Sequence, residues 1–174
     1  MNKGLFANEI SCLASRMLAV TEQVPFLGVF ARDELPDLNR VKRPSALVFN
    51  TDPKDKLGQH WLAIFCPKQG PLEFFDSFGF PPKFYSLDSL EFTHHRFSYQ
   101  SRLSSLCGHY CIMFIYLRSQ GTSYREILEL LDFHKSTGYD KFVHDLVHKI
   151  YSRFRILYPC APKGQCCTSN CVFC

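Results

Sequence analysis

Four residues of the types that perform acyl-transfer chemistry occur in the order His60, Asp76, Gln100 and Cys107. A cysteine supplies a sulfur nucleophile, a histidine supplies a base, and a carboxylate orients that base. An amide N–H₂ and a backbone N–H group can stabilise the oxyanion that forms during the reaction. These groups must meet in space, whatever their order in the chain. Together they predict a site for hydrolysis through a thioester.

Cys107 stands where the pattern of the sequence changes. The run 98–105 before it is largely polar, the run 111–117 after it is apolar, and Gly121 follows. This change predicts a loop that leads into the first turn of a buried helix, with the glycine as its C-terminal stop. Free N–H groups and the helix dipole at that position favour a thiolate, and the N–H of Cys107 is a second donor for an oxyanion. The alternative is that Cys107 is a small apolar core residue.

A predicted hairpin brings the base to its orienting acid. Strands over 60–66 and 72–76 are joined by the turn-forming run 67–71. If the turn centres on Lys68, His60 lies directly opposite Asp76, with Cβ atoms about 4.5–5.5 Å apart. A register slip of one residue would place the two side chains on opposite faces. The alternative is an ordinary solvated histidine and a strand-ending aspartate.

The other patterns predict a mixture of helices and strands, and therefore an α+β domain. The apolar run 25–31 is interpreted as an entry into the core followed by a loop. Ser123 and Glu126 form a capping box that predicts the start of another helix. The further predicted elements are a helix over 6–22, a strand over 45–50 that is buried on both faces, a short helix and then a strand within 83–99, and a helix over 139–154.

Composition limits the class of protein. With 174 residues, 46% of them hydrophobic, the chain can bury the core of one domain. No apolar run reaches the roughly 18 residues of a membrane-spanning helix. The first residues lack the features of a secretory signal, so we expect an intracellular protein whose nine cysteines are reduced.

The end of the chain differs from the rest. We expect a domain over 1–155 and a Cys-rich, basic appendage over 156–174, because no acidic residue follows Asp145. A basic end can bind DNA or an acidic partner, or it can simply be solvated. Loose thiols, a zinc site and lipidation are open for the cysteines. Those considered as zinc ligands are Cys160, Cys166 or Cys167, Cys171 and Cys174; those considered for lipidation are Cys166, Cys167 and Cys171.

Two histidines share one face of the last predicted helix. His144 and His148 have the i, i+4 spacing that can ligate a metal. No glutamate follows His144, so the H-E-x-x-H pattern is absent. We therefore interpret this pair as part of a solvated face and expect no metal in the domain.

The segments around the four candidate residues resemble a known family. Residues 58–61 (Gly-Gln-His-Trp), residues 75–79 (Phe-Asp-Ser-Phe-Gly), Gln100 and the pair Cys107-Gly108 closely resemble the adenovirus-type maturation protease, adenain. The wider clan includes the SUMO-deconjugating proteases, and chains of Polinton/Maverick elements and adenovirus-like viruses are also similar. The resemblance is clear over residues 25–120 and loose over 121–154. Two further segments contribute to it, 26–28 and 48–51.

The resemblance implies a papain-like fold with the permuted order His, Asp, Gln, Cys and a small, mostly antiparallel sheet packed against helices. It implies that Cys107 is the nucleophile, His60 the base and then the acid, and Asp76 the orienting residue. Gln100 and the N–H of Cys107 would form the oxyanion hole. Trp61 and Gly108 would border a narrow substrate groove, although Trp61 can equally anchor the core.

The implied function is a cysteine endopeptidase that matures capsid or core precursor proteins of a virus or transposon. No cofactor is required, and DNA or a peptide is a candidate activator. The host nucleus and the virion are the implied locations, and a monomer is expected. Ser89 stands about where the family has the cysteine that tethers its activating peptide, so we expect no such tether.

Two other functions remain open at this point. The orienting acid is Asp76, whereas the adenovirus enzyme has glutamate and the SUMO proteases have aspartate. This difference favours removal of a ubiquitin-like modifier as the alternative activity. A non-catalytic binding or membrane-associated module that uses the Cys-rich end is the third possibility.

Overall fold

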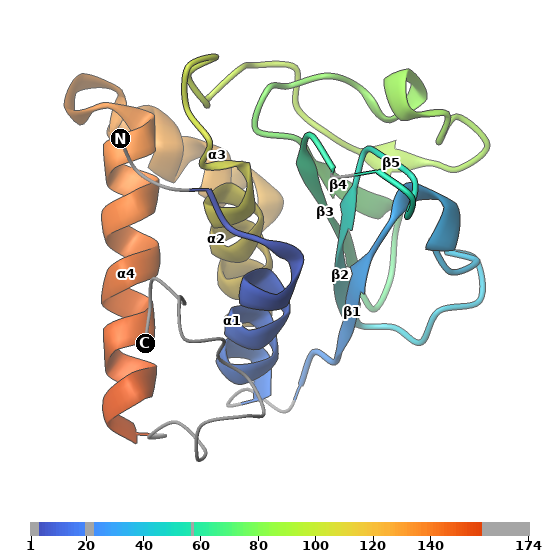
Figure 1. The fold of residues 1–174 in the computed structure, drawn as a ribbon, viewed down its shortest axis with the longest axis horizontal. Coiled ribbons are helices and arrows are strands. Elements are labelled where there is room, and N and C mark those ends of the chain that lie inside the picture. Colours follow the sequence, from blue (N-terminus) through green and yellow to red (C-terminus); the bar gives the residue numbers. More distant parts are fainter. Residues whose placement is uncertain (1–3, 20–22, 57, 158–174) are drawn as a thin grey trace.

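A mixed β-sheet with helices on one face forms the centre of the computed structural model (Figure 1). The structure describes residues 4–19, 23–56 and 58–157, and within them five strands follow one another across the sheet in chain order. The strands are β1 (Phe26–Phe30), β2 (Ser45–Asn50), β3 (Trp61–Cys66), β4 (Leu72–Phe75) and β5 (Phe92–Thr93). The predicted class, α+β, is confirmed.

The sheet is mixed, and the prediction of a mostly antiparallel sheet is corrected. The central strand β3 pairs antiparallel with β2 and with β4. The edge strands β1 and β5 pair parallel with β2 and β4. Residues 26–30 form β1, where the sequence was interpreted as a core entry and loop. Parallel pairing joins segments that are distant in the chain, so no local hairpin signal marks it.

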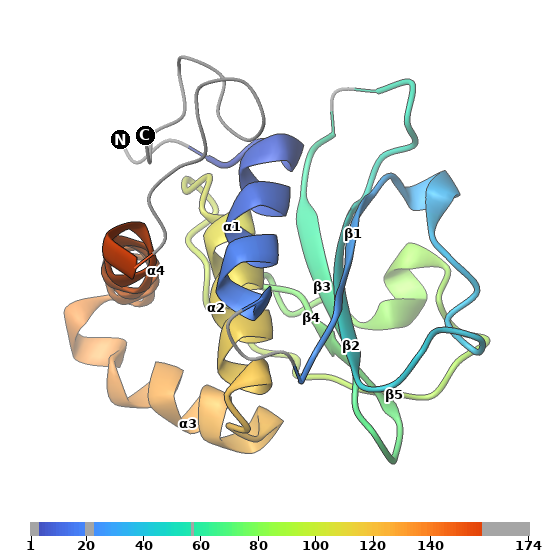
Figure 2. The same cartoon turned by 90° about the horizontal axis from the view of Figure 1, so that it is seen from below.

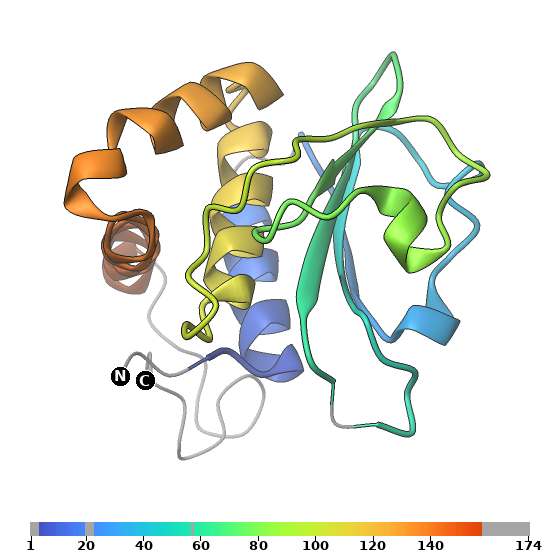
Figure 3. The same ribbon diagram turned by 90° about the horizontal axis from the view of Figure 1, so that it is seen from above.

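Both faces of the sheet are covered. In β2, Ala46 and Val48 belong to a core cluster on the helical side, while Leu47 and Phe49 belong to a cluster on the other side. This alternation confirms that the strand is buried on both faces. Figures 2 and 3 show the helices on one side of the sheet and the segment that contains the short helix Pro82–Tyr85 on the opposite side.

The described residues contain four α-helices, α1 (Ala7–Ala19), α2 (Cys107–Ser119), α3 (Tyr124–Phe133) and α4 (Tyr139–Leu157). Helix α2 is the central one, because it contacts β3, α1 and α4 and is buried along most of its length. No helix in this part of the chain is both long enough and apolar enough to cross a membrane.

The predicted helix boundaries agree well with the structure. Cys107 is the first residue of α2, and Gly121, with φ of +89°, follows its end. A glycine accepts this left-handed conformation without strain. The capping box of α3 has both of its hydrogen bonds, between Ser123 and Glu126. Helix α4 covers the predicted range 139–154 and continues to Leu157.

The segment between β4 and α2 differs from its prediction. The short helix is a 3₁₀ helix, Pro82–Tyr85, and the predicted strand is reduced to the two residues of β5. The chain from 94 to 100 instead passes next to the turn that follows β4. The Cys-rich appendage, with Cys160, Cys166, Cys167, Cys171 and Cys174, lies outside the described residues.

Candidate active site

The hairpin of β3 and β4 brings His60 and Asp76 together, but not in the predicted register. Ala63 pairs with Phe75 and Ile64 with Phe74, so the turn centres on Gln69 instead of Lys68. The predicted register is therefore wrong by two residues, and His60 lies diagonal to Asp76. An even shift keeps both side chains on one face, and diagonal neighbours remain within reach of long side chains. His60 Nε2 lies 2.7 Å from Asp76 Oδ1.

Asp76 is the most strongly held group of the site. Its side chain is 1% exposed and accepts hydrogen bonds from His60, from the backbone N–H groups of Phe78 and Phe80 at 2.9 and 3.1 Å, and from the Tyr85 hydroxyl at 2.7 Å. Burial alone would raise the pKa of this carboxyl group. The hydrogen bond and charge of His60, with the bonds from Tyr85 and Phe78, outweigh burial and lower the pKa. Asp76 is therefore ionised at neutral pH.

His60 lies between this carboxylate and the thiol. The residue is 8% exposed, and its ring lies over Phe78 with centroids 4.7 Å apart. Burial would lower the pKa of His60, but hydrogen bonds and charge interactions with Asp76 and Cys107 raise it to about 9. Because Nε2 is engaged by Asp76, Nδ1 is the ring nitrogen left for Cys107. The carboxylate fixes the orientation of the ring, with Nε2–H donating to Asp76 Oδ1.

Cys107 begins α2 beside this histidine and is partly exposed. Leu106 at the N-cap provides no side-chain acceptor for the first turn. The N–H groups of that turn therefore receive no side-chain cap, which is the local condition for stabilising an anion. Cys111, one turn later, is a contrast: it is buried, and burial raises its pKa well above the usual range.

Gln100 is buried with its amide fixed at both ends. Its Oε1 accepts a 2.6 Å hydrogen bond from the Ser77 hydroxyl, and its Nε2 donates to the carbonyl of Ser104 at 2.7 Å. These partners determine which end of the amide is nitrogen. An amide nitrogen carries two hydrogens, so one N–H of Gln100 remains for a ligand. Gln100 and Cys107 both border the same cleft.

The turn after β4 positions Asp76 and Gln100 together. The carbonyl of Ser77 accepts hydrogen bonds from the N–H groups of Tyr99 and Gln100, at 2.9 and 3.0 Å. Gly79 permits this approach: its φ is +75°, and a Cβ at this position would lie 2.6 Å from the carbonyl oxygen of Phe97. A side chain at Gly79 would therefore push the segment that carries Gln100 away from the turn.

The site lies in a cleft of about 860 Å³. Its lining includes His60, Trp61, Gln100 and Cys107, together with apolar residues of the N-terminal segment and β1. Trp61 also donates from Nε1 to the carbonyl of Leu5 at 3.0 Å, so it both borders the cleft and anchors that segment. The structure thus brings together Cys107, His60, Asp76, Gln100 and Trp61.

Gly108 has a different position from the one predicted. It is buried, and a Cβ there would meet Ile10 and Leu5 at 3.0 and 3.1 Å. It is not among the residues that line the cleft. Gly108 instead allows α2 to pack closely on α1 and on the segment that precedes it.

Sequence reasoning missed three residues that position the site. Tyr85 donates to Asp76, Ser77 holds Gln100, and Phe78 packs on the ring of His60. Ser77 and Phe78 stand next to Asp76, so their proximity was a usable signal. Tyr85 lies nine residues further, in the 3₁₀ helix, and no spacing rule connects it with the carboxylate.

No protein-family model matches the sequence, and no curated protein matches it significantly.

Proposed function

We propose that the protein is a cysteine-type peptidase. The observation that supports this proposal best is the placement of His60, which is hydrogen-bonded to the buried Asp76 on one side and interacts with Cys107 on the other. His60, Gln100 and Cys107 line one cleft, and Asp76 is buried behind His60. An inert core cysteine would not require an oriented base, an ionised carboxylate and an amide donor around it.

The reaction would proceed in two acyl-transfer steps. His60 carries the proton of the Cys107–His60 pair, and the Cys107 sulfur attacks the scissile carbonyl carbon as the thiolate of that ion pair. The oxyanion accepts hydrogen bonds from the free N–H of Gln100 Nε2 and from the backbone N–H of Cys107. His60 then protonates the leaving amine, and a thioester forms. Water, deprotonated by His60, hydrolyses the thioester and regenerates the thiol.

The proposed class is the adenovirus-type maturation proteases, with the papain-like arrangement in the permuted order His60, Asp76, Gln100, Cys107. The resemblance of residues 58–61 and 75–79 supports this class, as does a central helix that begins at the nucleophile and packs on a sheet. The proposed substrates are precursor proteins that present extended, glycine-rich segments to the cleft beside Trp61. Maturation of viral or transposon structural proteins is the proposed role.

A second candidate is the removal of a ubiquitin-like modifier. Asp76, the shorter of the two acids found in this clan, supports it, and it reaches His60 at 2.7 Å. The chemistry would be the same, and the two candidates differ only in the substrate.

The experiment uses the full chain and two kinds of active-site probe. One probe is a peptide with a glycine-rich sequence and a thiol-reactive C-terminal group; the other is a ubiquitin-like modifier with the same group. We expect the peptide probe to label Cys107, as identified by mass spectrometry. Substrates with the same two recognition elements report turnover.

Two cysteine variants complete the test. Cys107→Ala should abolish labelling and turnover, while the matched Cys12→Ala, in α1, should retain both. Selective labelling by the modifier probe would instead support the second candidate. An absence of labelling and turnover with both kinds of substrate would overturn the peptidase proposal.

A further inference from the structure

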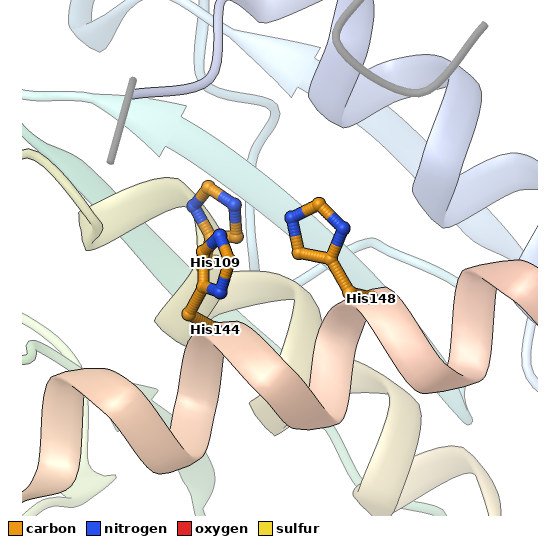
Figure 4. A group of neighbouring side chains, drawn as sticks. All are labelled: His109, His144 and His148. Atoms are coloured by element: carbon orange, nitrogen blue, oxygen red, sulfur yellow. The ribbon is translucent and has the colours of Figure 1, made fainter. Parts of the chain in front are cut away.

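Three histidines from two helices meet on the helical side of the molecule. His109 lies in α2, two residues after Cys107, and His144 and His148 lie one turn apart in α4. One ring nitrogen of each residue lies within 4.8 Å of the corresponding nitrogens of the other two. Figure 4 shows the rings of His144 and His148 extending from α4 toward His109. The two residues of α4 therefore face α2, which corrects their interpretation as a solvated face.

The rings are close enough to influence one another. Their centroids are 5.6 Å apart for His109 and His144, 6.1 Å for His109 and His148, and 4.2 Å for His144 and His148. His109 is 2% exposed, and the other two are half-buried. Burial, and then repulsion from His144 and His148, lowers the pKa of His109 to about 3. Burial, and then His144, also lowers the pKa of His148.

Neutral imidazole is the form that binds a metal. Three clustered imidazole nitrogens are a ligand set that suits a cation of borderline softness. His144 also has a carboxylate beside it, because its Nδ1 lies 3.3 Å from Asp145 Oδ1. A carboxylate in that position orients a ligating ring and leaves its Nε2 for the metal.

We propose that His109, His144 and His148 form a site for a divalent transition-metal ion, with Zn²⁺ the favoured occupant and a water molecule as the fourth ligand. In a tetrahedral site with Zn–N bonds of about 2.0–2.1 Å, the ligand nitrogens are about 3.3 Å apart. The present separations require the rings to close by roughly 1.5 Å or less, which is within the range of small side-chain rotations. The ion would join α4 to the first turn of α2. This site is separate from the proposed peptidase site and does not depend on it.

The test must isolate these histidines from other zinc-binding groups of the chain. We would use the chain of 174 residues in which Cys107 is replaced by alanine and the cysteines of the last 15 residues by serine. Zn²⁺ binding is measured by titration calorimetry, and Co²⁺ binding by absorption spectroscopy. We expect one equivalent of metal, a Co²⁺ d–d spectrum, and no thiolate-to-cobalt charge-transfer band.

Two variants remove ligands without disturbing the buried ring. His144→Gln and His148→Gln should each weaken Zn²⁺ binding at least 10-fold and abolish the rise in Tm that Zn²⁺ produces. The matched control is His134→Gln, which removes the histidine at the C-cap of α3, outside the cluster. It should leave both the affinity and the Tm shift unchanged. Binding that survives both ligand substitutions, or an absence of binding in the parent protein, would overturn the proposal.

Discussion

Two histidines near the start of α2 have pKa values that are shifted in opposite directions. His60 lies beside Cys107, and its pKa is raised to about 9. His109, which lies in α2 two residues after Cys107, has its pKa lowered to about 3. Burial opposes protonation of both rings. The difference comes from their neighbours: His60 faces an ionised carboxylate, whereas His109 faces two more imidazoles.

The surroundings of His60 therefore favour a protonated ring, whereas those of His109 disfavour one. A base that cycles between neutral and charged forms needs an anion that stabilises its cation. A metal ligand needs a lone pair that protons do not occupy. The first turn of α2 therefore places the Cys107 thiol beside His60 and Asp76, and places the His109 ring beside His144 and His148.

The largest expected effect follows from removal of the His60 side chain, the proposed base. Replacement of His60 by alanine should lower kcat/KM for peptide hydrolysis by roughly 10⁴-fold or more, because the thiol loses its proton acceptor. The measurement is turnover of a fluorogenic peptide at fixed pH. His134→Gln serves as the control, and it should retain the activity of the parent protein. Equal activity in the His60 variant would contradict the assigned role.

A smaller loss of activity should follow removal of the Asp76 charge, which distinguishes the surroundings of His60 from those of His109. Asp76→Asn keeps the size of the side chain, but the amide cannot stabilise an imidazolium ion. We expect kcat to fall about 10²- to 10⁴-fold and the pKa of His60 to fall below that of the parent protein. Activity measurements and NMR titration of the ring test the two effects separately. An unchanged His60 pKa would show that Asp76 is not the cause of the difference between His60 and His109.

Ser77→Ala should have a more moderate effect. Ser77 acts through Gln100, whose amide it holds by a 2.6 Å hydrogen bond. Loss of one oxyanion donor costs about 10²- to 10³-fold in kcat, so loosening that donor should cost about 10-fold, with KM nearly unchanged. Ser77→Thr, which keeps the hydroxyl, should recover part of the rate. A change confined to KM would indicate a role in substrate binding instead.

The smallest expected effect is on stability as a function of pH. The folded-state pKa of His60 is raised from an ordinary 6.5 to about 9. The resulting stabilisation is fully present below pH 6.5 and is lost as the pH rises through 9. We expect the urea midpoint of the parent protein to fall over this window relative to that of His60→Gln. Parallel pH profiles for the two proteins would show that the native state does not stabilise the His60 cation.

The parts of the site that sequence could predict are those encoded locally. The polar-to-apolar change at Cys107 and the glycine at position 121 define α2, and both are read along the chain. The contact between His60 and Asp76 was correct despite the wrong register, because a two-residue shift leaves the face of each strand unchanged. The sequence contained enough periodicity to determine the face, but not enough turn information to determine the exact pairing.

The parts that could not be predicted depend on long-range packing. Strand β1 joins the sheet by parallel pairing, which leaves no local pattern. Tyr85 reaches Asp76 only because the 3₁₀ helix packs over the far face of the sheet. His109 is separated by 35 residues from His144, so nothing in the sequence of α4 indicates that its i, i+4 pair faces α2.

The position of one partly exposed thiol in the cleft has a practical consequence for chemistry on this protein. Cys66 and Cys111 are buried, and burial raises the pKa of both thiols. An electrophile could reach these two thiols only after local unfolding. Cys107 instead borders a space of about 860 Å³, a volume that accommodates a drug-sized molecule. A compound that fills the cleft and carries a mild electrophile should therefore label Cys107 covalently, and its selectivity should depend mainly on its fit to the cleft.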